Sequence, residues 1–380
     1  MAVQHDFLVD LKNSSLADDN LFELFHANEV YTDDFNFLLP EENDFLLEDM
    51  SRTMKIVLCV LYGILCIGAF FGNTCILIVI IAKRSLRTVT NTFILSLAAS
   101  DILIAGWNMP LQLMFHLNNE WRLGEVMCKL TSFIQGVGII TSILALTAIA
   151  VERYHVICNP IKARYIRSTK SAVLMSVTLW ATAILVMLPH LWIQRLQERL
   201  LWQHEKYPPI RIAHLCVEYF PRFSYNVTYS FGFFFIFYIL PVVVMMYAYG
   251  KMAIVLWLRK PIGERLTQSP TNDRREQQKR SIVRMLIVIV VCYMICWLPF
   301  FAVNIVILFC KFTKTVRAIQ AFALLFGYSN AFVNALIYFF LNAKFNKLIK
   351  EKLGQFCQSS SRMRKISGTP IPLLSNTTCV

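Results

Sequence analysis

Ionisable and kink-forming residues interrupt long apolar stretches at a few positions in this sequence. Asp101 lies in the middle of one stretch, and Glu152 and Arg153 are adjacent at the end of another. A carboxylate in hydrocarbon is costly unless it finds polar partners, so we predict that Asp101 has a function. Arg153 alone could simply extend its guanidinium to a membrane surface. Pro299 removes an amide donor from an apolar helix, which predicts a kink.

The sequence gives little support for enzyme chemistry. His204 and Glu205 lie in a loop without a second histidine at the spacing of a metal site. A transporter would need further charges, broken helices or repeats along a pathway, and only the surroundings of Asp101 offer a candidate. We therefore expect a protein that is not an enzyme, and a polytopic transporter is kept as a remote alternative.

The composition predicts an integral membrane protein. The 380 residues are 56% hydrophobic and 16% charged, with a mean hydropathy of +0.52. Several apolar stretches approach or exceed the ~20 residues that cross a ~30 Å hydrocarbon core as a helix. They are residues 54–82, 91–117, 126–152, 171–193, 225–257, 282–310 and 317–341. Because these runs are continuous and not alternating, the predicted fold is an all-α bundle of seven transmembrane helices.

Charge predicts how this bundle is oriented. Residues 1–53 contain thirteen acidic residues and only Lys12 and Arg52 as bases, whereas the loops after odd-numbered spans are rich in Lys and Arg. The positive-inside rule then places the N-terminus outside and the C-terminus in the cytosol. The first residues lack the features of a signal peptide, so the first span is expected to act as the insertion signal.

We expect four segments along the chain. They are an acidic extracellular arm at 1–53, a transmembrane domain at 54–341, an amphipathic helix on the cytosolic membrane surface at 342–356, and a disordered cytosolic tail at 357–380. The loop between the fourth and fifth spans has about thirty residues. That length allows a hairpin lid over a wide pocket.

Cysteine positions predict one disulfide. Cys128, at the outer start of the third span, and Cys216, in the loop after the fourth, both lie on the oxidising side. Cys310 is also near the outer surface but has no evident partner. We therefore expect Cys128 and Cys216 to pair.

Three positions are candidates for covalent modification. Asn13, in the predicted extracellular arm, and Asn226, near the outer end of the fifth span, fit the glycosylation pattern, although Asn226 lies close to the bilayer. Cys357 follows the basic amphipathic stretch and is a palmitoylation candidate, with a free thiol as the alternative.

Each apolar stretch also carries one short motif. In order, these are Gly72-Asn73, Leu97-Ala98-Ala99-Ser100-Asp101, Glu152-Arg153-Tyr154, Trp180, Pro241 with Tyr249, Cys296-Trp297-Leu298-Pro299, and Asn334-Ala335-Leu336-Ile337-Tyr338. Together they resemble the rhodopsin-like (class A) G-protein-coupled receptors, across roughly residues 54–356. The resemblance implies a plasma-membrane location and partners that include a heterotrimeric G protein, arrestin, a receptor kinase and membrane lipids. It implies no nucleic-acid partner.

The resemblance gives the buried polar residues a role as an ion site. Ser142, Asn330 and Asn334 occupy positions that line a sodium pocket in the family, and with Asp101 they offer oxygen ligands that suit a hard cation. The alternative is a hydrogen-bonded water network without an ion. No other cofactor is implied.

The resemblance also implies a switch at the cytosolic face. Arg153 pairs with Glu152 at rest in the family, and Tyr249 and Tyr338 match two tyrosines that move towards the arginine on activation. An acid that clamps this arginine in many relatives is replaced here by Lys279. We therefore predict that Glu152 and packing alone hold the resting state, and raised basal signalling is a hypothesis that follows.

Two further switch positions lie on the sixth and seventh spans. Trp297 matches the aromatic residue on the floor of the binding pocket, beside the kink expected at Pro299. Ala335 replaces the proline that is usual in the seventh span, so that helix is expected to be straighter.

The third span narrows the ligand class. Gln135 stands where amine receptors carry an aspartate, and the seventh span has no lysine for a retinal Schiff base. Glutamine there is similar to receptors for Arg-Phe-amide peptides, neuropeptide Y and orexins, and an amide can both donate to and accept from a peptide carboxamide. A receptor for a lipid or another small molecule is the alternative.

Positions carried over from these peptide receptors predict a binding pocket. Glu218, two residues after Cys216, matches an acid that faces the peptide arginine, whereas Leu308 replaces a second acid and leaves Asn304 as the polar contact. The acidic arm is expected to attract a basic peptide. The predicted lining is Gln112, Gln135, His190, Glu218, Phe301 and Asn304.

Overall fold

The computed structural model describes residues 51–83, 86, 88–160, 169–201, 211–258, 270–309 and 314–341. Within them, seven helical segments are long and apolar enough to cross a membrane, as the sequence predicted. The arm at 1–53 apart from its last residues, the helix expected at 342–356, the tail, Asn13 and Cys357 all lie outside the described residues. The predictions for them stay predictions.

Four of the spans are formed mainly by single long helices and three are assembled from shorter pieces. The bounds, in chain order, are α4 (Arg52–Ala82); α5 (Val89–Leu103), η2 (Ile104–Asn108) and α6 (Met109–Asn118); α7 (Gly124–Cys158); α9 (Thr169–Met187) and α10 (His190–Ile193); α11 (Phe223–Phe234), η3 (Phe235–Ile239), α12 (Leu240–Ala253) and η4 (Ile254–Leu258); α13 (Pro270–Ile307); and α14 (Lys314–Leu341).

The helix bounds agree with the predicted spans except at two ends, both predicted to be cytosolic. Helix α13 begins at Pro270 and not at 282, and α7 continues past Glu152 to Cys158. Both extensions are polar enough that hydropathy assigned them to loops. The three η segments are π-helical turns, which the sequence did not predict. One of them, η3, directly precedes Pro241, where the missing amide disturbs the regular helical ladder.

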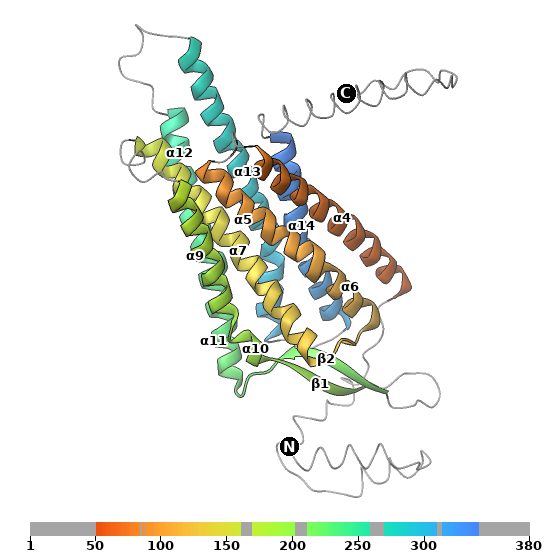
Figure 1. The fold of residues 1–380 in the computed structure, drawn as a ribbon. Coiled ribbons are helices and arrows are strands. Elements are labelled where there is room, and N and C mark those ends of the chain that lie inside the picture. The colour runs from red at the N-terminus through yellow and green to blue at the C-terminus, as the bar shows by residue number, and fades with distance from the viewer. Residues whose placement is uncertain are drawn as a thin grey trace, which may run out of the picture.

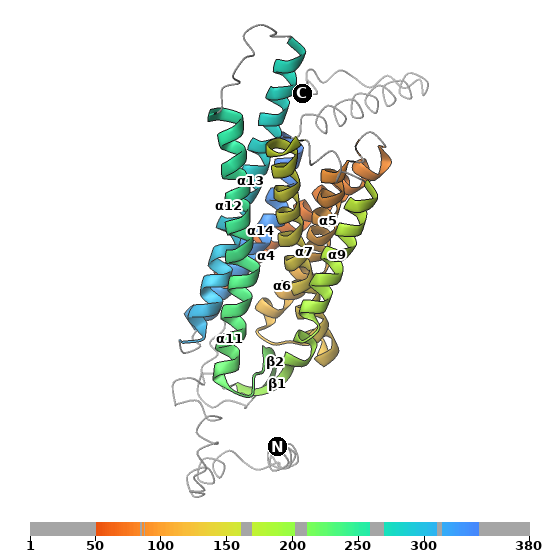
Figure 2. The same cartoon turned by 90° about the vertical axis from the view of Figure 1, so that its left-hand side faces the viewer.

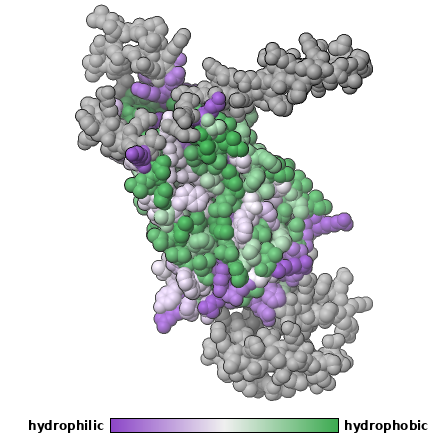
Figure 3. Space-filling model, viewed as in Figure 1, coloured by the Kyte–Doolittle hydropathy of each residue, from purple (hydrophilic) through white to green (hydrophobic). Residues whose placement is uncertain are grey.

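Helix α7 forms the centre of the bundle. It is the most buried of the seven spans, and it runs between α5, α9, α12 and α13 (Figures 1 and 2). Helices α4 and α9 have the most exposed spans. The exposed apolar side chains form a belt around the middle of the bundle, with hydrophilic residues towards its two ends (Figure 3). A belt of this kind is what a hydrocarbon solvent requires.

The loop after the fourth span forms the expected hairpin. Strand β1 (Gln194–Leu201) pairs antiparallel with β2 (Arg211–Glu218), and Leu196 lies opposite Cys216. The hairpin lies at the end of the bundle near α10 and α11 (Figures 1 and 2). The Trp121 amide donates to the His214 carbonyl over 2.7 Å, which ties the loop before α7 to β2.

Candidate ligand site and activation switch

An acidic cluster lies where the hairpin meets the bundle. Glu218, at the end of β2, places a carboxylate oxygen 3.6 Å from His190 Nε2 on α10. The His190 Nδ1 atom forms a 3.2 Å hydrogen bond with the Tyr229 hydroxyl on α11, and the two rings are stacked. The structure thus brings Glu218 and His190 together, as the predicted lining requires, and adds Tyr229.

Glu218 is reached by solvent although protein surrounds it. Its side chain is 43% exposed, whereas that of His190 is 10% exposed. The surrounding protein nevertheless desolvates the carboxylate and raises the pKa of Glu218 to about 7. The cluster therefore presents an acidic group that gains from a cationic partner, and an approaching cation can reach it.

A pair of amides lies on the inner faces of the second and third spans. The Gln112 side chain on α6 donates through Nε2 to Gln135 Oε1 on α7 over 3.0 Å. This bond leaves Gln135 Nε2 and Gln112 Oε1 to serve as a donor and an acceptor for other groups. The two predicted lining residues form one amide unit.

The remaining two predicted lining residues behave differently. Phe301 on α13 is 4% exposed and packs in an aromatic cluster with Phe233, Phe234 and Tyr238. Asn304 is half-buried, and its amide donates to the Phe300 carbonyl of its own helix over 2.7 Å. The structure therefore places Phe301 in the wall between α11 and α13, while Asn304 bonds within its own helix.

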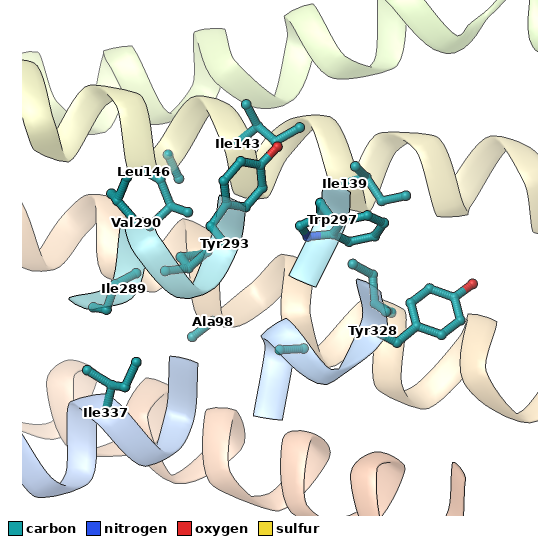
Figure 4. Packing of buried hydrophobic residues seen from close by; sticks show 14 of the residues in the cluster. Ala98, Ile139, Ile143, Leu146, Ile289, Val290, Tyr293, Trp297, Tyr328 and Ile337 are labelled. Carbon is teal, nitrogen blue, oxygen red and sulfur yellow. The ribbon is translucent and has the colours of Figure 1, made fainter. Parts of the chain in front are cut away.

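Trp297 lies against the seventh span. The side chain is 2% exposed, and Gly327 on α14 approaches so closely that a Cβ at 327 would lie 3.0 Å from two Trp297 ring carbons. Trp297 and Tyr293 point from α13 towards α7 (Figure 4). Pro299 lies inside the continuous helix α13 two residues later. The geometry therefore holds the bulky Trp297 side chain beside the proline, where α13 can bend.

Asp101 is at the centre of the predicted ion cluster. It is buried on α5, and its carboxylate accepts from Asn334 Nδ2 over 3.1 Å and from Ser142 Oγ over 3.5 Å. The amide oxygens of Asn330 and Asn334 are buried and have no hydrogen-bond partner among the described residues. The four predicted residues thus come from α5, α7 and α14, and two of their oxygens remain available.

Arg153 is held by two helices at the end of the bundle predicted to face the cytosol. Arg153 Nε lies 3.2 Å from Glu152 Oε2, and Thr90 Oγ1 on α5 donates to the same carboxylate oxygen over 2.8 Å. The Arg153 guanidinium also donates to Thr90 Oγ1. The prediction that Glu152 and packing alone hold Arg153 is therefore wrong, because the Thr90 hydroxyl bridges both members of the pair.

The other predicted switch residues lie on several helices of the bundle. Tyr249 on α12 and Tyr338 on α14 are 6% and 3% exposed. Tyr154 packs its ring against Tyr247, with centroids 6.1 Å apart. Lys279 is exposed on α13. The pairing of Arg153 with Glu152 and Thr90 is the arrangement expected of a resting state.

A family model described as "7 transmembrane receptor (rhodopsin family)" matches residues 72–338. The chain belongs to this receptor family. It is an integral, multi-pass protein of the plasma membrane and not an enzyme, as the motifs in its seven spans predicted.

Similar receptors come from a lancelet, a mammal and an insect. The receptor is 31% identical over 342 residues to the QRFP-like peptide receptor of Branchiostoma floridae, covering 89% of this chain and 88% of that one. It is 30% identical over 319 residues to the pyroglutamylated RF-amide peptide receptor of Rattus norvegicus, covering 80% and 72%. Tachykinin-like peptides receptor 86C of Drosophila melanogaster is 29% identical over 347 residues, covering 86% and 66%.

The predicted disulfide of the receptor is confirmed. Cys128 at the start of α7 and Cys216 in β2 are bonded, with their Cα atoms 5.6 Å apart. This bridge fixes Glu218, two residues along the strand, relative to the outer end of α7. Asn226 lies in the first turn of α11, and its side-chain oxygen accepts from Ser230 Oγ over 3.3 Å. Glycosylation at Asn226 stays a prediction.

Sequence reasoning missed several functional contacts of the receptor. Threonine and tyrosine are ordinary residues in a helix, so a single sequence does not indicate that Thr90 and Tyr229 make these contacts. The Ser100 hydroxyl lies 2.8 Å from Ser142 Oγ and extends the Asp101 cluster. Ser100 is next to Asp101 in the motif of the second span, and this adjacency is the one feature of the sequence that points to the contact.

Proposed function

We propose that the receptor binds an extracellular peptide with a basic residue close to an amidated C-terminus, and that binding activates a heterotrimeric G protein. The observation that carries this proposal is the acidic cluster of Glu218, His190 and Tyr229, which supplements the amide pair Gln112–Gln135. The similar Branchiostoma and rat receptors are named for peptides of this class, which supports the proposal.

The two polar groups match two different parts of such a peptide. A guanidinium next to Glu218 forms a charge-assisted hydrogen bond that an uncharged ligand does not form. The amide pair offers both donor and acceptor capacity to a terminal carboxamide. A terminal carboxylate would instead face the Gln112 acceptor oxygen. The pair therefore favours an amide over an acid at the peptide end.

Topology supports a meeting of opposite charges outside the cell. We place the N-terminal arm, with its thirteen acidic residues, on the extracellular side together with the hairpin. A basic peptide is then attracted before it reaches the acidic cluster, which raises its rate of encounter. Arrestin, a receptor kinase and lipids of the cytosolic leaflet are further partners in this proposal.

Signal transfer in this proposal runs through α13. A ligand that contacts Phe301 and Trp297 acts on α13 close to Pro299, where the helix lacks one internal hydrogen bond. Movement of the cytosolic half of α13 opens space beside Arg153. The guanidinium then leaves Glu152 and Thr90 to meet the G protein, with Tyr249 and Tyr338 moving towards it.

The residues around Asp101 fit a sodium ion. Asp101, Ser142, Asn330 and Asn334 would hold it, because two buried amide oxygens lack partners and one carboxylate supplies charge. A bound sodium ion would supply positive charge that stabilises an ionised Asp101 in the resting bundle. An ordered water is the alternative occupant, and lithium or sodium titration of agonist affinity in wild type and Asp101→Asn separates the two.

Agonist-stimulated nucleotide exchange on purified G protein tests the proposal. The panel contains peptides that end in Arg-Phe-amide, the same peptides with a free carboxylate, amines and lipids. We expect exchange with the amidated peptides, and a selective loss of potency for them in Gln135→Ala. Exchange with lipids or amines alone would assign the alternative ligand class, and substrate flux without exchange would overturn the receptor mechanism.

Matched variants test the two halves of the site separately. Glu218→Gln keeps the shape of the side chain and removes its charge, so the potency of an arginine-containing peptide should fall about ten- to a hundred-fold. The same peptide with citrulline in place of arginine should bind wild type and Glu218→Gln equally. An equal loss for both peptides would contradict the pairing of arginine with Glu218.

A further inference from the structure

Two tyrosines join the fifth and sixth spans by reciprocal hydrogen bonds to backbone. The Tyr238 hydroxyl on η3 donates to the Met294 carbonyl on α13 over 2.8 Å. In the opposite direction, the Tyr293 hydroxyl on α13 donates to the Phe237 carbonyl over 3.4 Å. Their rings lie 6.2 Å apart, so the two bonds form one compact contact.

Pro241 explains why one of these carbonyls needs a partner. A proline has no amide hydrogen for the carbonyl four residues earlier, which here is that of Phe237. Tyr293 is fully buried and Tyr238 is 5% exposed. In hydrocarbon no water replaces the missing amide, so the Tyr293 hydroxyl supplies the Phe237 carbonyl with a donor from another helix.

The second bond has a different character. Leu298 has an amide that can reach the Met294 carbonyl within α13, since Pro299 only removes the donor for Ile295. The Tyr238 hydroxyl therefore adds a cross-helix bond to a carbonyl that is served within its own helix. Its loss removes a link between two helices and leaves no buried carbonyl unpaired.

This contact lies between the candidate ligand wall and the pivot. Phe301 packs against Tyr238 with ring centroids 5.1 Å apart, and Trp297 lies 6.4 Å from Phe301. Tyr293 lies one turn of α13 from Trp297 and points to the same side, towards α7 (Figure 4). A displacement of Phe301 therefore acts directly on the Tyr238 ring.

We propose that Tyr238 and Tyr293 form a tyrosine latch between η3 and α13 that sets the threshold for α13 to pivot at Pro299. They are positioning residues, because they act through α13 and do not contact the G protein. The inference rests on the proposed activation by α13 movement. The latch is closed in a structure whose Arg153 is paired with Glu152 and Thr90, which associates the closed latch with the resting state.

Ligand-free nucleotide exchange measures this threshold. Tyr238→Phe removes one hydroxyl and keeps the ring packing against Phe301, so we expect basal exchange to rise about two- to ten-fold, the range of one buried hydrogen bond. Tyr62→Phe is the matched control, because Tyr62 is 1% exposed and its hydroxyl has no partner among the described residues. That control should leave basal exchange unchanged. Unchanged or lowered exchange in Tyr238→Phe would overturn the latch.

Hydrogen exchange of backbone amides provides a readout that needs neither ligand nor G protein. In lipid nanodiscs, Tyr238→Phe should speed amide exchange in α13 from about residue 290 to 300 and leave α7 unchanged. If no peptide of the panel activates the receptor while this local exchange rises, the latch stands and the proposed ligand fails. If peptides activate normally and α13 protection is unchanged, the latch fails and the proposed function stands.

A double variant tests whether the two bonds act as one unit. Tyr293→Phe removes a buried donor to the Phe237 carbonyl next to Pro241, so we expect it to lower thermal stability as well as to raise basal exchange. In a single latch, Tyr238→Phe and Tyr293→Phe together should raise exchange less than the product of the two separate effects. An effect equal to that product would show two independent contacts and overturn the single latch.

Discussion

At the scale of single residues, Thr90 changes how the resting state is understood. One hydroxyl donates to Glu152 and accepts from Arg153, so a neutral side chain from α5 restrains the arginine. In many members of the family an acid at the position of Lys279 is expected to have this role. A bond to a charged group is stronger than one between neutral groups. We therefore expect Thr90 as well as the Glu152–Arg153 ion pair to limit basal activity.

Removal of the Thr90 hydroxyl should raise basal activity. Thr90→Val keeps the shape and deletes both hydrogen bonds, and we expect ligand-free nucleotide exchange to increase about tenfold or more. Thr90→Ser keeps the hydroxyl and should stay near wild type. Equal basal exchange in Val and Ser variants would show that the hydroxyl does not restrain Arg153.

The raised pKa of Glu218 gives ligand binding a pH dependence. Its surroundings raise that pKa to about 7, so the free carboxyl is largely protonated below pH 7 and ionised above it. A guanidinium pairs with the ionised form. Binding of an arginine peptide must therefore expel a proton at low pH, and affinity should fall by up to about tenfold per unit below pH 7.

Binding curves from pH 5.5 to 8 check this expectation. Glu218→Gln should flatten the profile, because its amide does not titrate. His190 lies beside the same carboxylate, so His190→Gln serves as the second arm and should leave the pH profile unchanged. A profile that Glu218→Gln leaves unchanged while His190→Gln flattens it would assign the dependence to the histidine.

At the scale of elements, close packing between α4 and α14 accompanies the absence of the usual proline. A Cβ added at Gly72 would lie 2.8 Å from Ala335 Cβ, and the Asn73 side chain donates to the Ala331 carbonyl over 3.0 Å. Helix α14 is continuous from Lys314 to Leu341. Ala335 in place of the usual proline predicted a straighter helix. The contact shows that the small Ala335 side chain packs against Gly72 of α4.

Enlargement of Gly72 should destabilise the bundle. Gly72→Ala forces α4 and α14 apart, and we expect about 1–3 kcal/mol of lost stability, read as a lower thermal unfolding temperature in detergent. Gly63→Ala, where a Cβ meets no atom within 4 Å, is the control on the same helix. Equal unfolding temperatures for the two variants would mean that the interface relaxes without cost.

The hairpin depends on its bridge to α7. Cys128→Ser with Cys216→Ser leaves the Trp121–His214 backbone bond as one remaining tie between the loop before α7 and β2. We expect a loss of about 2–5 kcal/mol of stability and a larger loss of peptide affinity than of basal exchange. Unchanged affinity in this double variant would show that β2 holds Glu218 without the disulfide.

At the scale of the whole molecule, the sequence predicted what hydrophobicity and strong motifs control. Seven spans, the hairpin loop and the disulfide followed from apolar length, topology and residue type, and the members of the Asp101 cluster followed from the resemblance of the motifs to a known family. The π-helical turns did not, because they depend on how backbone bonds are shared in three dimensions. Thr90, Tyr229 and the tyrosine latch were missed for a related reason, since each is an ordinary residue whose partner lies on another helix.

The outward exposure of Glu218 has a consequence for chemical probes of this receptor. The carboxylate is partly open to solvent at the hairpin end, while the Gln112–Gln135 pair lies on the inner faces of the second and third spans. A peptide that inserts its C-terminus towards the amide pair leaves its N-terminal residues outside the bundle. Dyes, lipids or affinity tags attached at that N-terminus should therefore be tolerated, whereas any attachment at the C-terminus should abolish binding.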